Sequence, residues 1–370
     1  MKIKSLLAFL LMASLLSCNN AKNDNSSSMK EIFVIEKGLN VSHWLSQTNI
    51  RGEEREAYMQ ALDFEKIAEM GFDHVRIPID EVHFWDEAGS KQKDAFELLH
   101  KAINWSFENN LRVIVDLHVI RSHHFNAKDN TLWTDPAEQE KFWNFWNQLS
   151  EELIQYPNSK LAYELMNEAV AEDSEDWNKL IAKGIEIVRK NEPERVIVVG
   201  SNKWQQAFTF PELKIPENDT NLILSFHDYE PFLFTHYKTP WNPVYIKYEG
   251  EVHYPGYTID TAQYANLEGE LLDKVRNDNG YFDKDVLEEH IMIAKKVADE
   301  YGLRLYCGEF GCFPTTNIAD RVRLYTDLME IFDKHDISWT HWNYKNDFPV
   351  VDEETLEPIS EIVDVLIGNK

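Results

Sequence analysis

The sequence predicts a closed (β/α)₈ barrel, and two patterns in the chain indicate it. From residue 33 onward, short apolar runs rich in β-branched residues alternate with longer segments, most of which have helical periodicity. Apolar strands that alternate with helices form a parallel sheet covered on both faces. There are eight such runs, the number of strands in this barrel. An open doubly wound sheet is the alternative, but no glycine-rich phosphate loop follows the first run.

The eight strands are expected at 33–41, 74–79, 111–118, 161–168, 196–201, 222–229, 303–311 and 337–345. Helix signals lie between them. Asp135 is expected as the N-cap of a helix whose first residue is Pro136. Only the segment after the fifth strand has a weak helical pattern.

The longest connection, residues 230–283 between the sixth and seventh strands, is dense in Trp, Tyr, Pro and His. A segment of this length in a compact barrel is more often functional than idle. Its aromatic side chains either stack against a polysaccharide or pack a small subdomain beside the barrel.

The N-terminus has the pattern of an export signal. Lysines precede an apolar run of about 11–13 residues, which is too short to span a bilayer and typical of a signal peptide. The run ends in LLSC, which resembles the lipobox of bacterial lipoproteins and makes Cys18 the expected lipidation site; an incidental cysteine is the alternative. The expected organisation is signal peptide 1–17, lipidated cysteine and flexible tether 18–32, and one catalytic barrel domain 33–370.

The formal net charge of −27 restricts the partners. Nothing in such a chain would neutralise a row of phosphates, so nucleic acid and anionic lipid surfaces are excluded as electrostatic partners. We expect a monomer that is secreted across the inner membrane and held by its lipid anchor, in the periplasm or at the cell surface. Membrane contact is then expected only through the anchor.

The remaining cysteines and a histidine-rich segment raise the question of a metal. Cys307 and Cys312 are expected to be free, buried thiols, because the strand and loop that carry them separate the two sulfurs. His118, His123 and His124 could cluster, but no carboxylate has metal-site spacing to them. We expect neither a metal ion nor a cofactor.

Polar and aromatic residues end nearly every predicted strand. Active sites of (β/α)₈ barrels lie at the carboxyl ends of the strands, so these side chains are expected to share one mouth. They are Arg76, His118, Asn167, Glu168, His227, Tyr229, Glu309 and Trp342.

Glu168 and Glu309, on the fourth and seventh strands, can face each other across this mouth. Glycoside hydrolysis uses two carboxyl groups in one pocket, one as the acid and one as the base or nucleophile. Repulsion between them raises the pKa of the acid, while Arg76 and Tyr229 can keep the other ionised. Trp342 offers a flat apolar face to a sugar ring.

The motifs RIP, DLH, ELMNE, FHDYEPF, GEFG and WNYK follow one another on successive strands and resemble those of glycoside hydrolase family 5, the retaining, cellulase-like barrels of clan A. The resemblance covers about residues 36–366. It implies Glu168 as acid/base and Glu309 as nucleophile, with no metal. It also implies that Asn167 binds the 2-hydroxyl of the sugar, that Arg76 and Tyr229 hold Glu309, that His118 and His227 line the site, and that Trp342 lies beneath the sugar, with Trp204 on the same rim.

One stretch departs from the family pattern. Many members carry Gly-Gly before the first-strand Trp, where this chain has Ser42-His43, so the wall of the cleft differs. The expected activity is that of a retaining endo-β-1,4-glucanase on β-glucan. The alternatives are a β-mannanase, an exo-acting β-glucosidase or β-1,3-glucanase, or a glycan-binding lipoprotein without activity.

Overall fold

The computed structural model describes residues 32–368. The predicted signal peptide, Cys18 and the predicted tether up to residue 31 lie outside the described residues. Within the described part, no helix is both long enough and apolar enough to cross a membrane.

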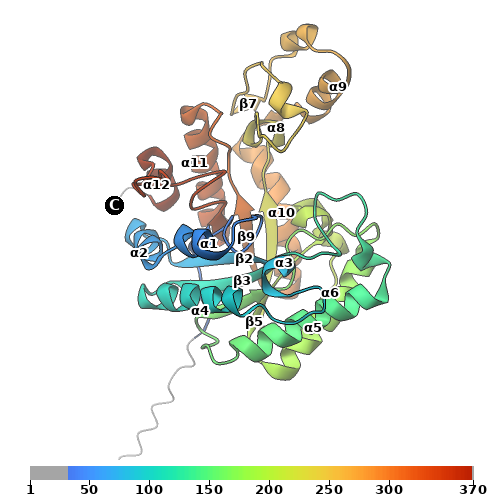
Figure 1. Cartoon of the computed structure of the whole chain (residues 1–370). Helices are drawn as coiled ribbons and strands as arrows, with labels where there is room; N and C mark the ends of the chain where they lie inside the picture. The colour runs from blue at the N-terminus through green and yellow to red at the C-terminus, as the bar shows by residue number, and fades with distance from the viewer. Residues whose placement is uncertain (1–31, 369–370) are drawn as a thin grey trace, which may run out of the picture. The chain divides into compact units, whose positions relative to one another are not determined.

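Eight parallel strands close into a barrel, as predicted (Figure 1). Around the barrel the order is β1-β10-β9-β6-β5-β4-β3-β2. The strands are β1 (Lys37–Asn40), β2 (His74–Asp80), β3 (Arg112–Val119), β4 (Leu161–Glu164), β5 (Val196–Gly200), β6 (Leu222–Asp228), β9 (Arg304–Phe310) and β10 (Ser338–His341).

Three predicted strands, at 33–41, 161–168 and 337–345, are much shorter than expected, and the last of them ends at His341. Phe33 and Ile35 lie before β1, outside the strand. Both are buried in an apolar cluster with residues of five barrel strands. After β4, the chain leaves the sheet at Leu165, and Glu168 has a φ of 44°, which no strand residue adopts. The predicted range 161–168 therefore comprises a four-residue strand and the loop that follows it.

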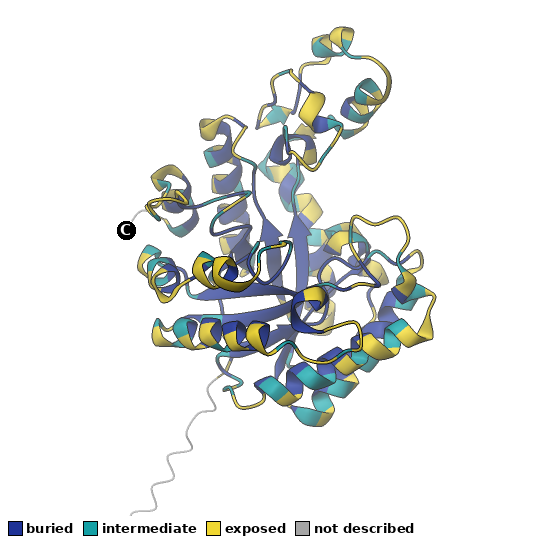
Figure 2. Ribbon diagram, in the orientation of Figure 1, coloured by how far each residue is buried: buried dark blue, intermediate teal, exposed yellow. Residues whose placement is uncertain are grey.

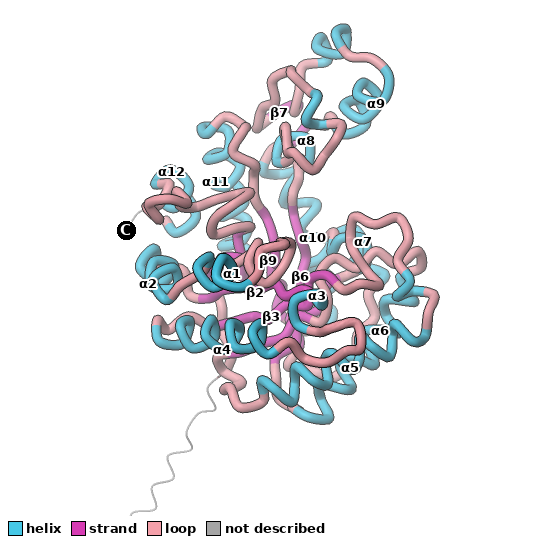
Figure 3. The backbone as a smooth tube through the Cα atoms, viewed as in Figure 1, coloured by secondary structure: helices cyan, strands magenta, loops and turns pink. Residues whose placement is uncertain are grey.

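Helices surround the barrel (Figure 3). They are α1 (Gly52–Tyr58), α2 (Ala61–Met70), α3 (Glu81–Phe84), α4 (Lys93–Glu108), α5 (Pro136–Leu153), α6 (Ser174–Asn191), α10 (Lys284–Tyr301), α11 (Ile318–His335) and α12 (Ser360–Ile367). Asp135 caps α5 by accepting from the Ala137 N–H, and Pro136 is its first residue, as predicted. Between β5 and β6 there are only the short α7 (Asn202–Gln205) and the 3₁₀ helix η2 (Ala207–Glu212), which matches the weak pattern there.

The strands are buried on both faces, whereas each helix buries one side (Figure 2). In β3, Val113, Val115 and Leu117 pack under the helices, and the alternate residue Ile114 belongs to the cluster inside the barrel. Asp116 and His118 continue the inward series toward the carboxyl end. Mostly apolar side chains therefore fill the barrel near the amino ends of the strands, and polar side chains fill it near the carboxyl ends.

The connection 230–283 forms a small subdomain with its own elements (Figure 1). They are α8 (Phe232–Thr235), η3 (Tyr245–Lys247), β7 (Gly256–Tyr257), η4 (Thr261–Asn266), α9 (Gly269–Asp278) and β8 (Tyr281–Phe282), of which β7 and β8 pair antiparallel. Tyr245, Tyr248 and Tyr254 are buried in it, so packing explains these three aromatic residues. Trp241 remains 43% exposed.

Candidate active site

All eight residues predicted for the mouth lie at the carboxyl end of the barrel. Arg76, His118, His227 and Glu309 are in β2, β3, β6 and β9. The other four, Asn167, Glu168, Tyr229 and Trp342, follow β4, β6 and β10 within a few residues.

Glu168, Glu309 and His227 meet at the centre of this group. One side-chain oxygen of each glutamate and one ring nitrogen of His227 all lie within 4.8 Å of one another. A separation of about 5 Å between two carboxyl groups is the spacing of retaining glycosidases, since it leaves no room for a water molecule between the sugar and the second carboxylate. The pair therefore has the geometry for a covalent glycosyl-enzyme intermediate.

Glu309 is held by two donors. The Arg76 Nη1 donates to its Oε1 at 2.8 Å, and the Tyr229 hydroxyl donates to its Oε2 at 2.9 Å. Burial raises the pKa of Glu309 to about 7, while Arg76 and Tyr229 act to lower it. Both contacts favour the ionised form of this carboxyl group.

Glu168 has a different environment. Its Oε1 lies 2.9 Å from the Nδ1 of His227, and its backbone N–H donates to the side-chain oxygen of Gln205 at 2.9 Å. Burial, followed by the charge of Glu309, raises the pKa of Glu168 well above its usual value. Burial and Arg76 lower the pKa of His227, so its ring is neutral at neutral pH and adds no positive charge beside Glu168. A proton shared by the two glutamates therefore resides on Glu168.

A buried polar network lies beneath the pair. Besides Glu309, the guanidinium of Arg76 contacts Glu164 at 2.6 Å and Asp116 at 3.0 Å. Burial opposes its charge, but the surrounding carboxylates outweigh burial and raise the pKa of Arg76. Arg76 also donates to the side-chain oxygens of Asn40 and Asn167, both at 2.9 Å.

Asn167 and Trp342 each contact a residue of this network. With its oxygen engaged by Arg76, Asn167 has a buried amide nitrogen with no hydrogen-bond partner among residues 32–368. This nitrogen is available to donate to a sugar hydroxyl. The Trp342 ring is stacked against that of His118, with the centroids 5.5 Å apart and the planes at 11°. His118 is oriented by a 2.7 Å hydrogen bond between its Nδ1 and Asp116.

Four residues of the network were not among the predicted site residues: Asn40, Asp116, Glu164 and Gln205. Asp116 and Glu164 do carry a signal, because each is an acid at an inward position of an apolar strand. Asn40 is the last residue of β1. Nothing in the sequence marks Gln205, which reaches the site from a turn in which Lys203, Trp204 and Gln205 all have φ between 53° and 61°.

Several other predicted features lie around the mouth. Trp204 is 41% exposed on the rim, with its indole N–H donating to the Phe125 carbonyl at 2.9 Å. The ligand atoms of His118, His123 and His124 do not gather into a metal-binding group within the described residues, where Glu168, His227 and Glu309 form the one such group. Cys307 and Cys312 are free and buried, as predicted.

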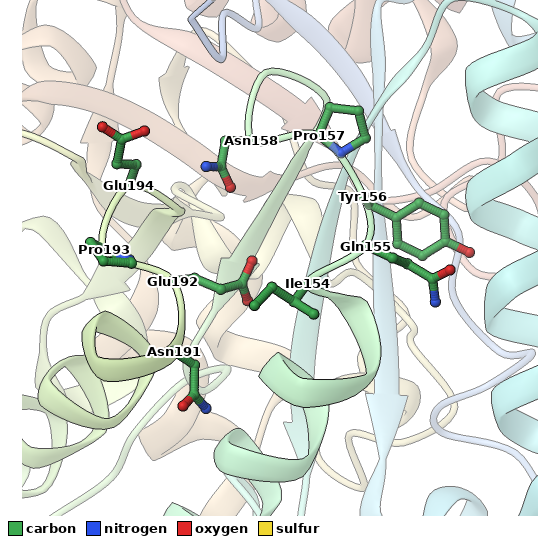
Figure 4. Close-up of a pocket in the computed structure, with 9 residues that line it drawn as sticks. All are labelled: Ile154, Gln155, Tyr156, Pro157, Asn158, Asn191, Glu192, Pro193 and Glu194. Atoms are coloured by element: carbon green, nitrogen blue, oxygen red, sulfur yellow. The ribbon is translucent and has the colours of Figure 1, made fainter.

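A hollow of about 590 Å³ lies at the opposite end of the barrel, between the loops that lead into β4 and β5 (Figure 4). The carboxylate of Glu192 in this hollow accepts from Arg195, from the Tyr163 hydroxyl at 2.7 Å and from the Ser150 hydroxyl at 2.9 Å. These contacts give Glu192 a structural role. Because the hollow lies at the amino ends of β4 and β5, it is separate from the catalytic mouth.

Comparison with known proteins agrees with this geometry. The family described as cellulase (glycosyl hydrolase family 5) matches residues 36–348. Endoglucanase C of Acetivibrio thermocellus is 29% identical over 338 residues, covering 90% of this chain and 98% of the relative. Cellodextrinase A of Ruminococcus flavefaciens is 28% identical, covering 82% and 83%. Thermotoga maritima Cel5A, solved with cellobiose, superimposes with a TM-score of 0.74 at 22% identity, covering 90% and 98%, and so shares the fold.

Proposed function

Because this chain belongs to glycoside hydrolase family 5, the cellulase family, we propose that it is a retaining endo-β-1,4-glucanase that acts on β-glucan. The observation that carries the proposal is the pair of buried glutamates with oxygens within 4.8 Å of each other, of which Glu168 has the more strongly raised pKa while Arg76 and Tyr229 favour the charge of Glu309. The endoglucanase name of a relative aligned over nearly its whole length supports the choice of substrate.

In the first proposed step, Glu309 attacks the anomeric carbon while Glu168 donates its proton to the glycosidic oxygen. The bond to the leaving sugar breaks, and a glycosyl ester of Glu309 forms. Glu168, now ionised, then removes a proton from a water molecule that attacks the anomeric carbon and releases Glu309. The tyrosine and arginine donors orient Glu309 for the attack.

Asn167 and Trp342 are proposed to bind the sugar under attack. The open amide donor of Asn167 suits the 2-hydroxyl, and the indole of Trp342 suits the apolar C–H face of the ring. His118 supports the indole, and His227 remains neutral beside the proton donor. The chain's own side chains supply every group in this scheme, so it uses no cofactor.

The test is a panel of soluble β-glucans, mannans and xylans with the purified protein and two variants. We expect hydrolysis of β-1,4-glucan to mixed oligosaccharides and no turnover by Glu309→Ala, since no intermediate can form. The activity of Glu168→Ala should fall least on aryl glycosides with good leaving groups, because such groups need little protonation. Added azide should then give a β-glycosyl azide, and an α product would contradict the assigned roles. Release of single glucose units alone would favour an exo-acting enzyme.

For the N-terminus we propose that residues 1–17 are removed on export and that Cys18 is lipidated. Residues 18–32 would then tether the catalytic domain, 33–370, to a membrane. The apolar run and the LLSC motif support this proposal. The enzyme would act as a monomer in the periplasm or at the cell surface.

A further inference from the structure

The ring of Tyr229, whose hydroxyl donates to Glu309, lies against two aromatic side chains from other loops. Its centroid is 5.0 Å from that of His236, with the ring planes at 74°, and 6.0 Å from that of Phe348. His236 and Phe348 also contact each other edge to face, with centroids 5.7 Å apart. Both are buried. We call these two side chains the aromatic clamp of Tyr229.

A chain of hydrogen bonds joins the clamp to the backbone of Tyr229. The Thr235 hydroxyl lies 2.5 Å from the Tyr229 carbonyl oxygen, the shortest of its contacts, and 3.0 Å from the Nδ1 of His236. A hydroxyl has one hydrogen to donate, so Thr235 donates to the carbonyl and accepts from the Nδ1–H of His236. The turn α8 and the histidine after it therefore hold both the main chain and the ring of Tyr229.

Contacts from three loops meet at this turn. The Phe313 N–H donates to the Thr235 carbonyl at 2.8 Å, which ties α8 to the loop after β9, the strand that carries Glu309. The rings of Phe313 and Phe348 meet edge to face with centroids 5.8 Å apart, so the loop after β10 belongs to the same junction. The start of the subdomain 230–283 is thus fixed to the strands on either side of the nucleophile.

Tyr229 needs such support because it lies one residue beyond the end of β6, where no strand pairing holds its backbone. A hydroxyl donates to a carboxylate oxygen only over a narrow range of distances and angles. The bond from Tyr229 acts to lower the pKa of Glu309. A ring that moved away from the Glu309 Oε2 would therefore let the nucleophile hold its proton more tightly.

The contacts of the clamp reach Glu309 through Tyr229. The other charged or titratable groups around this carboxylate are Arg76, Asp116, Glu164, Glu168 and His227. Within residues 32–368, no hydrogen bond, ion pair or ring contact joins His236 or Phe348 to any of them. Burial lowers the pKa of His236 to about 3, so its ring is neutral and adds no charge beside the phenol.

We propose that His236 and Phe348 are positioning residues of the reaction, which hold the phenol of Tyr229 against the carboxylate of Glu309. The first turn of the subdomain then serves the nucleophile, and its role goes beyond packing or contact with substrate. The two side chains transfer no proton and act through Tyr229 alone. This inference rests on the proposed function, in which Glu309 is the nucleophile, and adds to it the groups that fix one of its two donors.

The test combines His236→Ala with Tyr229→Phe in a double-mutant cycle on soluble β-1,4-glucan. We expect His236→Ala to lower kcat/KM by about 10-fold, the scale of a lost hydrogen bond to a charged group, through kcat rather than KM. The acidic limb of its pH profile should move to higher pH, because Glu309 must be ionised and loses a contact that lowers its pKa. In Tyr229→Phe protein, adding His236→Ala should change kcat/KM by less than about two-fold.

A second readout needs no substrate. The NMR signal of the Glu309 carboxyl carbon, assigned by its loss in Glu309→Gln, should titrate at higher pH in His236→Ala than in the native protein. Phe348→Leu keeps an apolar side chain at its position and should shift both readouts in the same direction. It decides the question if thermal unfolding shows that His236→Ala is not folded.

His253→Ala is the matched control, because His253 lies exposed in the same subdomain and faces Glu251 and Asp320. It should leave both readouts unchanged. An unchanged titration of Glu309 in the folded clamp variants, or the same loss of kcat/KM with and without the Tyr229 hydroxyl, would overturn the clamp. A native protein that hydrolyses no β-1,4-glucan would instead contradict the proposed function, and the NMR titration would still decide whether the clamp acts on Glu309.

Discussion

At the scale of single residues, Glu168 and Glu309 differ because their partners differ. Glu309 accepts from a guanidinium and a phenol, which stabilise its charge. Glu168 faces a histidine whose pKa burial lowers, and it faces the charge of Glu309. Two identical side chains therefore have different proton affinities, and the environment sets which one is the acid.

We predict that Glu168→Gln stabilises the protein at neutral pH. The folded-state pKa of Glu168 lies above its unfolded value, so the folded state binds more protons between the two values. Stability is then lost as pH rises through this range, and the glutamine variant does not share that loss. We expect the Tm of the variant to exceed that of the native protein by ~2 °C or more at pH 7, and by less at pH 4.

Glu309→Gln is the matched comparison. The pKa of Glu309 is raised only to about 7, and the glutamine removes a negative partner from the fully buried Arg76, so this variant should gain less in Tm at pH 7 than Glu168→Gln. Calorimetric scans of both variants between pH 4 and pH 8 measure these effects. A Tm difference for Glu168→Gln that does not grow with pH would contradict the electrostatic explanation.

At the scale of elements, the turn after β5 supports the backbone of Glu168. The side chain of Gln205 accepts from the Glu168 N–H and donates to Ser225 at 3.1 Å and Glu164 at 3.3 Å. A Cβ on Gly200 would come within 2.2 Å of this side chain, so only glycine leaves room for it. A strained turn, a glycine and a glutamine act together to hold the proposed acid.

Gln205→Leu should therefore impair proton donation. We expect kcat/KM to fall by about 10-fold on glycosides with poor leaving groups, the scale of one lost buried hydrogen bond, and to fall less where the leaving group needs no proton. The matched control is Gln206→Leu, since Gln206 accepts from Ser201 and Thr209 through its main-chain oxygen. An equal loss on all leaving groups would indicate a general structural effect.

The subdomain formed by residues 230–283 carries a second element-scale prediction. The Trp241 ring packs against Phe348, which in turn contacts Tyr229, yet Trp241 remains 43% exposed. An exposed indole near the mouth can stack only on sugars distant from the bond that is cleaved. Trp241→Ala should lower kcat/KM on a hexasaccharide by about 1–2 kcal/mol and hardly change activity on a short aryl glycoside.

The competing role for Trp241 is packing. In that case Trp241→Ala would lower the Tm and leave the ratio of the two activities unchanged. Trp204→Ala, in the turn after β5, provides a second indole of similar exposure for comparison.

At the scale of the whole molecule, charge and anchoring are connected. A chain with a net charge of −27 is repelled by anionic surfaces, so a covalent lipid is the route by which it would be kept at one.

We predict that Cys18→Ala moves the protein from the membrane fraction to the soluble fraction. Removing the cysteine removes the lipid attachment point and leaves the apolar run of the signal peptide unchanged. Fractionation followed by immunoblotting measures the distribution, and Cys307→Ala, which lies in the barrel, is the control. A Cys18→Ala protein that remains with membranes would contradict the anchor.

The sequence by itself determined the eight strands, the cap of α5, the weak segment after β5 and the residues at the mouth. These are local properties, because strand periodicity, capping and strand ends depend on a few neighbouring residues. Once the strands close into a barrel, their carboxyl ends must meet, so the mouth follows from the strand ends alone.

Arg76 was predicted to hold Glu309, but tertiary structure alone decided which further groups support the mouth. Arg76 and Glu164 lie 88 residues apart in the chain, and Gln205 reaches Glu168 across 37 residues. The sequence also left open whether each aromatic residue of 230–283 is buried or exposed, and it gave no sign that Phe348 would meet Tyr229. Such contacts depend on how distant loops pack, and a pattern of neighbouring residues carries no information about that packing.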